Sequence, residues 1–208
     1  MNLLNYLNTE EKRFIKKINT PEKIQNFLDS IEYSSDHIYR CPLRVLRERV
    51  GHCFDGALFA AAMLQQNGNP PLILDMLPNK RDDDHILTLF KVDGNWGAIA
   101  KSNFVGLRYR EPIHKTLREL VLSYFEQYYN VEKEKTLRGF TRPLNLSMFD
   151  RFEWQSKNET MDMIADKLDT LKRYSILTSK MQKRLLKVDE RTYRAGLIGV
   201  NKAGLFKP

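Results

Sequence analysis

Apolar and polar positions follow helical spacing in the first part of the chain. Asn8-Thr9 and Thr20-Pro21-Glu22 are helix-capping patterns, and each precedes apolar residues spaced for one helix face. The stretch from Leu43 to Val50 has the pattern of a short helix, which Gly51 interrupts. The sequence therefore predicts two packing helices followed by a short third helix.

A longer helix, predicted to begin at Cys53, is apolar almost all round. It contains Ala60-Ala61-Ala62 and stops at Asn67-Gly68-Asn69-Pro70-Pro71. A helix without a polar face belongs in the interior, and three consecutive alanines let a sheet approach closely. We expect this helix to be buried at the centre of the fold.

Strand spacing follows over Leu72–Met76, Ile86–Val92 and Trp96–Ala100. Asp93-Gly94 is a tight-turn pattern, so the last two of these segments predict a β-hairpin. Helical spacing then returns. The remaining predicted elements are amphipathic helices over His114–Tyr129 and Glu159–Leu177, with Pro143-Leu144-Asn145 as a connector.

These elements predict an α+β fold, in which a buried helix with a cysteine at its N-terminus packs on an antiparallel sheet, with additional N- and C-terminal helices. The chain has 208 residues, of which 42% are hydrophobic, enough for one substantial core. We expect a single domain over residues 1–208. Its core is predicted at about 40–130, and a basic helical extension at about 145–208.

Composition also bears on the setting of the protein. The sequence shows no secretory pattern and no apolar run near ~20 residues, which predicts a cytoplasmic protein without a membrane span. Cys41 and Cys53 are then expected as free thiols, and a Cys41–Cys53 disulfide is the alternative. Four scattered histidines and two cysteines do not predict a metal site, and we expect no cofactor.

The net charge of +8 resides in the last part of the chain. Residues 171–208 contain ten Lys or Arg and two acidic residues, so residues 1–170 are close to neutral. This segment has no zinc-finger, RNP or KH pattern, and its apolar residues can pack. A solvated basic face on a docked helix is therefore favoured over binding of nucleic acid or anionic lipid.

Cys53 and His85 are the candidate reactive residues. Unpaired N–H groups and the positive end of the dipole at a helix N-terminus favour the thiolate form of a cysteine there. His85 opens the second predicted strand and is the candidate base. The alternative interpretation is structural, with Cys53 as a small packing group and His85 as a core or surface residue.

Several local patterns together resemble the transglutaminase-like superfamily, relatives of the papain-like cysteine enzymes. They are Gly51-His52-Cys53 at the start of a buried helix, Gly68-Asn69-Pro70-Pro71 before a strand, His85 opening the next strand, and Gly94-Asn95-Trp96 after a tight turn. The resemblance covers roughly residues 45–105. It implies that Cys53 attacks an amide or ester carbonyl and that His85 takes and returns the proton.

The third catalytic position departs from this family. The resemblance places the usual aspartate at Ala100, which cannot orient an imidazole ring. A two-residue Asp93-Gly94 turn brings Ser102 opposite His85, whereas a bulged loop brings Asn103 there instead. Asn103 is the better orienter, because its amide oxygen accepts from a ring nitrogen as in Cys-His-Asn enzymes. Ser102 is the fallback.

Residues around the hairpin complete the candidate site. Trp96 is expected in the core or in the wall of the pocket. Lys101 and Arg108 are predicted at the rim of the cleft, where they would present positive groups to an acidic or carboxylate-bearing substrate. The alternative is a solvated loop with structural Arg–Glu pairing. The Asp82-Asp83-Asp84 stretch before His85 is interpreted as a solvated acidic turn.

The sequence thus predicts a cysteine-dependent acyl-transfer enzyme that acts on an amide or isopeptide bond of a peptide or protein, as a peptidase, an amidase or a transglutaminase-like enzyme. The backbone N–H of Cys53 is a candidate oxyanion-hole donor. The alternative is a catalytically inactive transglutaminase-like module that binds a peptide or protein in the same cleft, which Ala100 favours.

Overall fold

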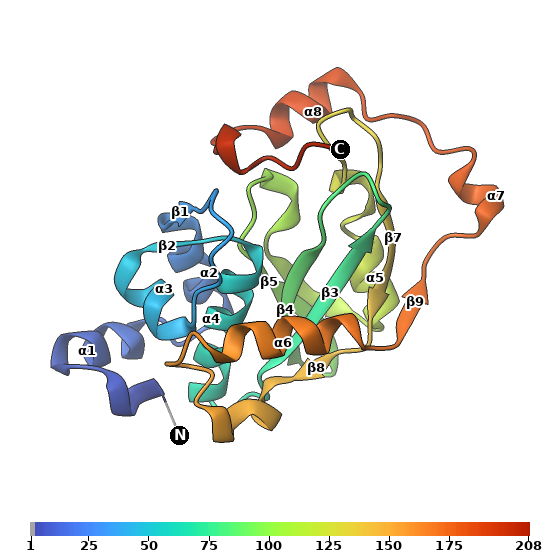
Figure 1. Ribbon diagram of the computed structural model, residues 1–208. Helices are drawn as coiled ribbons and strands as arrows, with labels where there is room; N and C mark the ends of the chain where they lie inside the picture. The colour runs from blue at the N-terminus through green and yellow to red at the C-terminus, as the bar shows by residue number, and fades with distance from the viewer. Residues whose placement is uncertain (1–2) are drawn as a thin grey trace.

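An antiparallel sheet forms the centre of the computed structural model, which describes residues 3–208 (Figure 1). The strand order is β6-β5-β4-β3-β7-β9, and β8 pairs with the start of β3. The chain is mixed α+β, as predicted. The strands are β3 (Leu72–Pro78), β4 (His85–Val92), β5 (Asn95–Ile99), β6 (Arg110–His114), β7 (Leu137–Thr141), β8 (Leu144–Asn145) and β9 (Arg173–Ser175).

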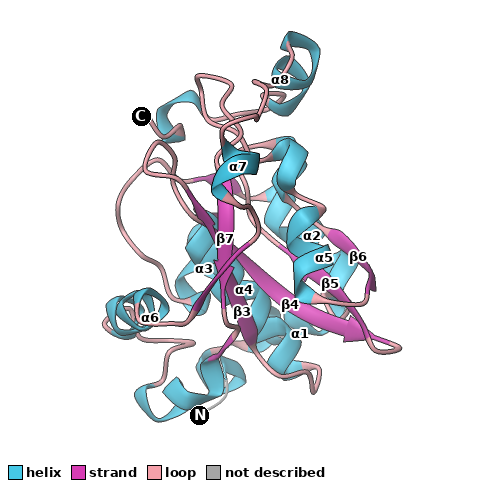
Figure 2. Cartoon of the chain, turned by 90° about the vertical axis from the view of Figure 1, so that its right-hand side faces the viewer, coloured by secondary structure: helices cyan, strands magenta, loops and turns pink. Residues whose placement is uncertain are grey.

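The two faces of the sheet carry different helices (Figure 2). One core cluster joins Ile73, Ile86 and Phe90 to the apolar residues of α1–α4 and α6. The other cluster joins Leu87 and Leu89 to α5 and the segment that follows it. Successive residues of β4 therefore contact opposite layers, because side chains alternate across a strand. The helices of these layers are α1 (Thr9–Lys17), α2 (Pro21–Ser30), α3 (Pro42–Glu48), α4 (Cys53–Gln66), α5 (Leu117–Leu122) and α6 (Thr160–Asp169).

The central helix α4 lies where the sequence predicts it. Residues 53–64 are all buried, in agreement with an apolar helix that lacks a polar face. The Thr88 hydroxyl of β4 donates to the Ala57 carbonyl of α4 over 2.6 Å, which fixes the helix against the sheet. Glycine is required at the neighbouring position 56 of α4, because an added Cβ would lie 2.2 Å from the Cβ of Lys101.

The predicted starts of α1 and α2 are confirmed. Asn8 accepts from the Glu11 backbone N–H and caps α1, and Thr20 accepts from the Lys23 N–H and caps α2. The predicted third helix is shorter than expected. It ends at Glu48 because Arg49 adopts a left-handed conformation, after which β2 (Val50–Gly51) pairs in parallel with β1 (Glu32–Tyr33).

Later parts of the chain correct the predicted helices. The helix expected over 114–129 is limited to α5, and His114 instead ends β6, which pairs with Trp96 of β5. The helix expected over 159–177 ends at Asp169, and the residues after it form β9 against β7. Hydrogen bonds to distant strands override the local spacing in both places. The expected connector at 143–145 also pairs with β3, through β8.

The C-terminal extension combines short helices with irregular segments. It contains α7 (Ser179–Gln182), which stands away from the body of the molecule in Figure 1, and α8 (Glu190–Gly196). Ile176 and Val188 are buried on either side of the α7 region, so the extension is docked at these points.

Cys41 and Cys53 are both buried free thiols. Within residues 3–208, no helix combines the length and the apolar character needed to cross a bilayer.

Candidate functional site

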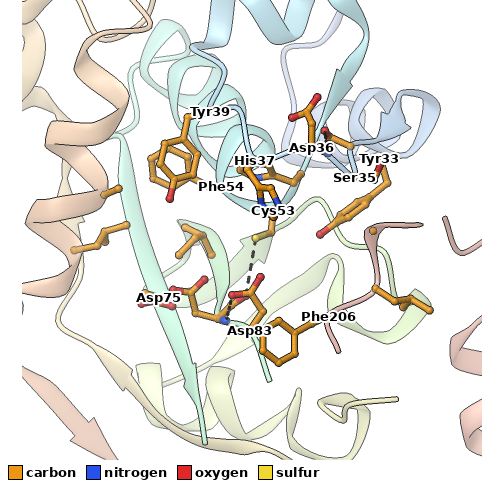
Figure 3. A pocket seen from close by; sticks show the side chains of 18 of the residues that line it. Tyr33, Ser35, Asp36, His37, Tyr39, Cys53, Phe54, Asp75, Asp83 and Phe206 are labelled. Atoms are coloured by element: carbon orange, nitrogen blue, oxygen red, sulfur yellow. Dashed lines mark hydrogen bonds between the residues drawn. The ribbon is translucent and has the colours of Figure 1, made fainter. Parts of the chain in front are cut away.

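A cavity of about 400 Å³ lies at the N-terminus of α4 (Figure 3). Cys53 is on its wall, and the opposite walls come from the β1 region, the β3 and β4 strands, α6, and the C-terminal residues Ala203–Phe206. This cavity is the candidate site, because it is the place where the predicted nucleophile meets open space. Its aromatic walls are Tyr33, Tyr39, Phe54 and Phe206.

The start of α4 is held by a buried polar network. The Asp55 carboxylate accepts from the backbone N–H groups of Arg40 over 2.8 Å and of His52 over 3.2 Å. Burial raises the pKa of Asp55 to about 7, and these hydrogen bonds oppose the shift. The Arg40 guanidinium also pairs with Asp55, at 3.7 Å. The backbone at residues 40 and 52 is thereby fixed next to Cys53.

The Cys53 thiol is in its neutral form. It is 9% exposed, and its Sγ lies 4.0 Å from the Asp84 carbonyl oxygen. Burial raises the pKa of Cys53 well above its ordinary value, and the negative charges of Asp84 and Asp83 add to the shift. The helix N-terminus is therefore outweighed by burial and by like charge, and the expected thiolate is not favoured here.

His85 lies on the other face of the sheet. Its Nε2 is 2.8 Å from the Leu107 carbonyl oxygen and therefore donates to it, and its ring makes an edge contact with Tyr128 at 6.4 Å between centroids. It is Ile86, the next residue, that lines the cavity with Cys53. The structure does not bring Cys53 and His85 together, because adjacent residues on a strand point to opposite faces.

The predicted orienting residues make other contacts. Both ends of the Asn103 amide bind the Asn201 backbone, with Nδ2 donating to the carbonyl and Oδ1 accepting from the N–H. The Ser102 hydroxyl accepts from the Phe104 N–H. The backbone of Ala100 pairs with the Gln25 side chain in both directions. None of these three residues lines the cavity.

The three predicted substrate-binding residues do not line this cavity either. Trp96 stacks under the Lys91 ammonium group, 4.1 Å from its ring centroid. Lys101 is buried rather than at a rim, and its Nζ donates to the carbonyls of Leu28 and Ile31 at the end of α2. Burial lowers the pKa of Lys101 to about 8. Arg108 pairs with Asp29 at 2.9 Å, in a separate surface pocket.

The charged groups that line the cavity with Cys53 are mainly carboxylates. Asp75 is 4% exposed, lies on β3 and faces the cavity, and within residues 3–208 its Oδ1 has no hydrogen-bond partner. Burial raises the pKa of Asp75 to about 8, with a further contribution from Asp84. The cavity thus contains a carboxyl group that has lost its water and gained no counter-ion in exchange.

Further aspartates line the mouth of the cavity. Asp83 and Asp84 are open to solvent on one side, yet the surrounding protein excludes enough water to raise the pKa of Asp84 to about 6. Asp36 and Asp169 complete the acidic lining. The sequence predicted a solvated turn over 82–84, in which Asp83 and Asp84 are indeed exposed, and it assigned no role to Asp75. An aspartate inside an apolar strand segment was the available signal.

Positive charge is scarce around these carboxylates. His37 and His52 are the basic residues that line the cavity, and burial lowers the pKa of His52 to about 4, so it is neutral at pH 7. Arg173 of β9 lies outside the cavity wall and pairs with Asp169 at 3.5 Å. Its charge lowers the pKa of Asp75 and of Asp84 without cancelling the effect of burial.

Within residues 3–208, no group of three or more His, Cys, Asp or Glu side chains is arranged to hold a metal ion.

No protein-family model matches the sequence, and a search of curated proteins found no match either.

Proposed function

We propose that this chain is a catalytically inactive, transglutaminase-like binding module whose acidic cavity takes a cationic group of a peptide or protein. The ligand group would be an ammonium or a guanidinium, held by Asp75 inside the cavity and by Asp83 and Asp84 at its mouth. The observation that carries the proposal is the unpartnered Oδ1 of Asp75 on the wall of an open cavity.

Burying a carboxylate costs free energy unless a cation or hydrogen-bond donors compensate for the lost water. Asp75 lies among other aspartates, and Arg173, whose charge acts on Asp75, is paired with Asp169. A cation that enters the cavity would supply both the missing donor and the missing charge. The site is therefore complementary to a positive group, and it repels carboxylate-bearing ligands.

The placement of the reactive residues supports an inactive module. An acyl-transfer site needs a nucleophile and a base within hydrogen-bond reach. Here Cys53 and His85 contact opposite layers, the pKa of Cys53 is raised, and the His85 Nε2–H donates to Leu107. Burial also lowers the pKa of His85 to about 4. Neither group is prepared for proton exchange with the other.

The test compares a blocked tripeptide with a central lysine to its Nε-acetyl counterpart, by calorimetric titration at pH 8. We expect the lysine peptide to bind and the neutral acetylated peptide not to bind. Asp75→Asn should weaken binding at least tenfold. The matched control is Asp166→Asn, an exposed residue of α6 that does not line the cavity, and this variant should bind as the wild type does. Equal binding of both peptides contradicts the proposal.

The acyl-transfer enzyme is a second candidate, favoured by one observation: Cys53 is at the first turn of α4 and on the cavity wall. In that case the nucleophile is Cys53. His37, which lines the same cavity, would then replace His85 as the base. Thiol alkylation separates the two candidates. Fast labelling of Cys53 relative to Cys41, lost in His37→Ala, supports the enzyme, and slow labelling unaffected by His37→Ala supports the module.

A further inference from the structure

The residues from 201 to 206, here called the closing segment, form one wall of the acidic cavity. Ala203, Gly204, Leu205 and Phe206 all line it, although they are about 150 residues from Cys53 in the sequence. The closing segment begins with Asn201 and contains a short 3-10 turn, Lys202–Gly204, in which the Ala203 N–H donates to the Asn201 side chain. Its backbone is thus locally ordered.

Asn201 fastens the closing segment to the body of the molecule. Asn103 binds its backbone twice, accepting from the Asn201 N–H over 2.8 Å and donating to its carbonyl over 2.9 Å. The Asn201 side chain also donates to the Tyr33 carbonyl over 2.9 Å. These three hydrogen bonds connect the closing segment to the loop after β5 and to β1. They give Asn103 a positioning role in place of the predicted catalytic one.

A glycine lets the closing segment lie directly on the cavity wall. A Cβ at Gly204 would be 3.1 Å from the Tyr33 ring and 3.2 Å from the Ser34 carbonyl oxygen. These distances are tighter than ordinary van der Waals contact, so a larger residue would push the segment outward. Leu205 and Phe206 follow immediately, and the close approach of Gly204 carries them to the cavity.

Phe206 brings an apolar ring to a cavity that is otherwise acidic on this side. Phe206 is 40% exposed, and Figure 3 shows its ring below the Cys53 thiol, on the side of the cavity where Asp83 lies. An exposed phenylalanine at the edge of an acidic cavity gains contacts when a ligand enters. Tyr33 and Tyr39 line the same cavity, so a ligand cation would meet aromatic surfaces as well as carboxylates.

We propose that the closing segment completes the ligand site, and that Phe206 selects ammonium groups that carry alkyl substituents, such as a methylated lysine side chain, over the unsubstituted ammonium. The selectivity rests on the proposed cation-binding function. An alkylated ammonium keeps its positive charge, attracts the face of an aromatic ring, and gives up water more readily than a primary ammonium. A carboxylate site without aromatic rings would show the opposite preference.

The first part of the test measures access to the cavity and does not depend on any ligand. Alkylation of Cys53 by iodoacetamide is followed by mass spectrometry, with the buried Cys41 of a separate pocket as the internal reference. We expect a chain ending at Gly204 to be alkylated at Cys53 at least threefold faster than the full chain. Asn103→Ala should give a similar increase, and Asn103→Asp, which keeps the acceptor for the Asn201 N–H, a smaller one.

The second part measures selectivity, with blocked tripeptides that contain lysine or trimethyl-lysine. The full chain should bind the trimethylated peptide more tightly, and Phe206→Ala should reduce this preference about fivefold. Leu186→Ala, an exposed apolar residue away from the cavity, is the control and should leave the preference unchanged.

The two parts of the test distinguish failure of the proposed binding function from failure of the proposed selectivity. If neither peptide binds but truncation speeds alkylation, the cation-binding function is overturned and the closing segment remains a wall of the cavity. If peptides bind but Phe206→Ala leaves their ratio unchanged, the selectivity is overturned and the binding function stands. If truncation and Asn103→Ala leave alkylation of Cys53 unchanged, the closing segment does not cover the cavity.

Discussion

The Nε2 atom of His85 lies 2.8 Å from the carbonyl oxygen of Leu107, on the α5 side of the sheet. Since a carbonyl only accepts, this contact assigns the ring proton to Nε2 and occupies the nitrogen with a structural hydrogen bond. Cys53 lies in the other layer, beside Ile86. The histidine that most resembles a catalytic base therefore connects β4 to the loop before β6.

Replacing His85 should cost stability and leave the thiol unaffected. His85→Ala removes a buried ring and leaves the Leu107 carbonyl without its donor, which should lower the free energy of unfolding by about 1–3 kcal/mol. Urea denaturation measures this loss. Alkylation of Cys53 in the folded variant should match the wild type. A tenfold fall in alkylation with unchanged stability would return His85 to a catalytic role.

The contribution of Asp75 to stability should fall as pH rises from 6.5 to 8.5. Its pKa is raised to about 8 in the folded protein, so the folded state holds a proton in this window that the unfolded chain has released. Asp55, with a pKa raised to about 7, acts in the same direction. His52, His85 and Lys101 act in the opposite direction, because their pKa values are lowered to about 4, about 4 and about 8 in the folded protein and the unfolded chain therefore binds more protons at these groups. Denaturation midpoints at several pH values measure the slope.

Asp75→Asn isolates the contribution of this carboxyl group. The variant should equal the wild type in stability near pH 4, where Asp75 is protonated, and exceed it increasingly toward pH 8.5. The Asp166→Asn control should keep the wild-type slope, since Asp166 is exposed on α6. Parallel slopes for wild type and Asp75→Asn would show that Asp75 is ionised throughout and already compensated.

Binding of a cationic peptide should strengthen over the same pH range. Asp75 and Asp84, with pKa values raised to about 8 and about 6, lose their protons as pH rises, and each carboxylate then attracts the ligand. The lysine peptide itself stays charged up to pH 8.5. Calorimetric titration at pH 6 and pH 8.5 should show at least a threefold gain in affinity. An affinity independent of pH would separate the site from these carboxylates.

Local chemistry made part of the fold predictable. The caps at Asn8 and Thr20 start helices because their side chains satisfy free N–H groups. The Asp93-Gly94 turn fixed the hairpin register, with Val92 paired to Asn95 as a two-residue loop requires. Each of these features is decided by residues within a few positions of one another, so the sequence contains its full cause.

The site was less predictable because β4 is buried on both faces. A half-buried strand reveals its core face by alternation, but His85 through Phe90 are all buried, so nothing local indicates which residues meet α4. The choice between His85 and Ile86 was therefore open to error. Asp75 and the closing segment become neighbours of Cys53 through long-range packing alone.

Lys101 provides the last prediction, since the sequence placed it at a substrate-binding rim and the structure places it under α2. Its Nζ donates to the carbonyls of Leu28 over 2.8 Å and Ile31 over 2.6 Å, at the negative end of that helix. Lys101→Met keeps most of the volume but leaves both carbonyls unpartnered. We expect the free energy of unfolding to fall by about 2 kcal/mol, measured by urea denaturation.

The exposed Lys115 supplies the matched control, and Lys115→Met should change the free energy of unfolding by less than about 0.5 kcal/mol. Affinity for the lysine peptide should be the same in Lys101→Met and wild type, because Lys101 does not line the cavity. A structural role and a ligand-binding role of Lys101 predict changes in different measurements. A structural cation lowers stability alone, whereas a residue at the ligand rim would change affinity with stability intact, and that outcome would contradict the placement of Lys101 under α2.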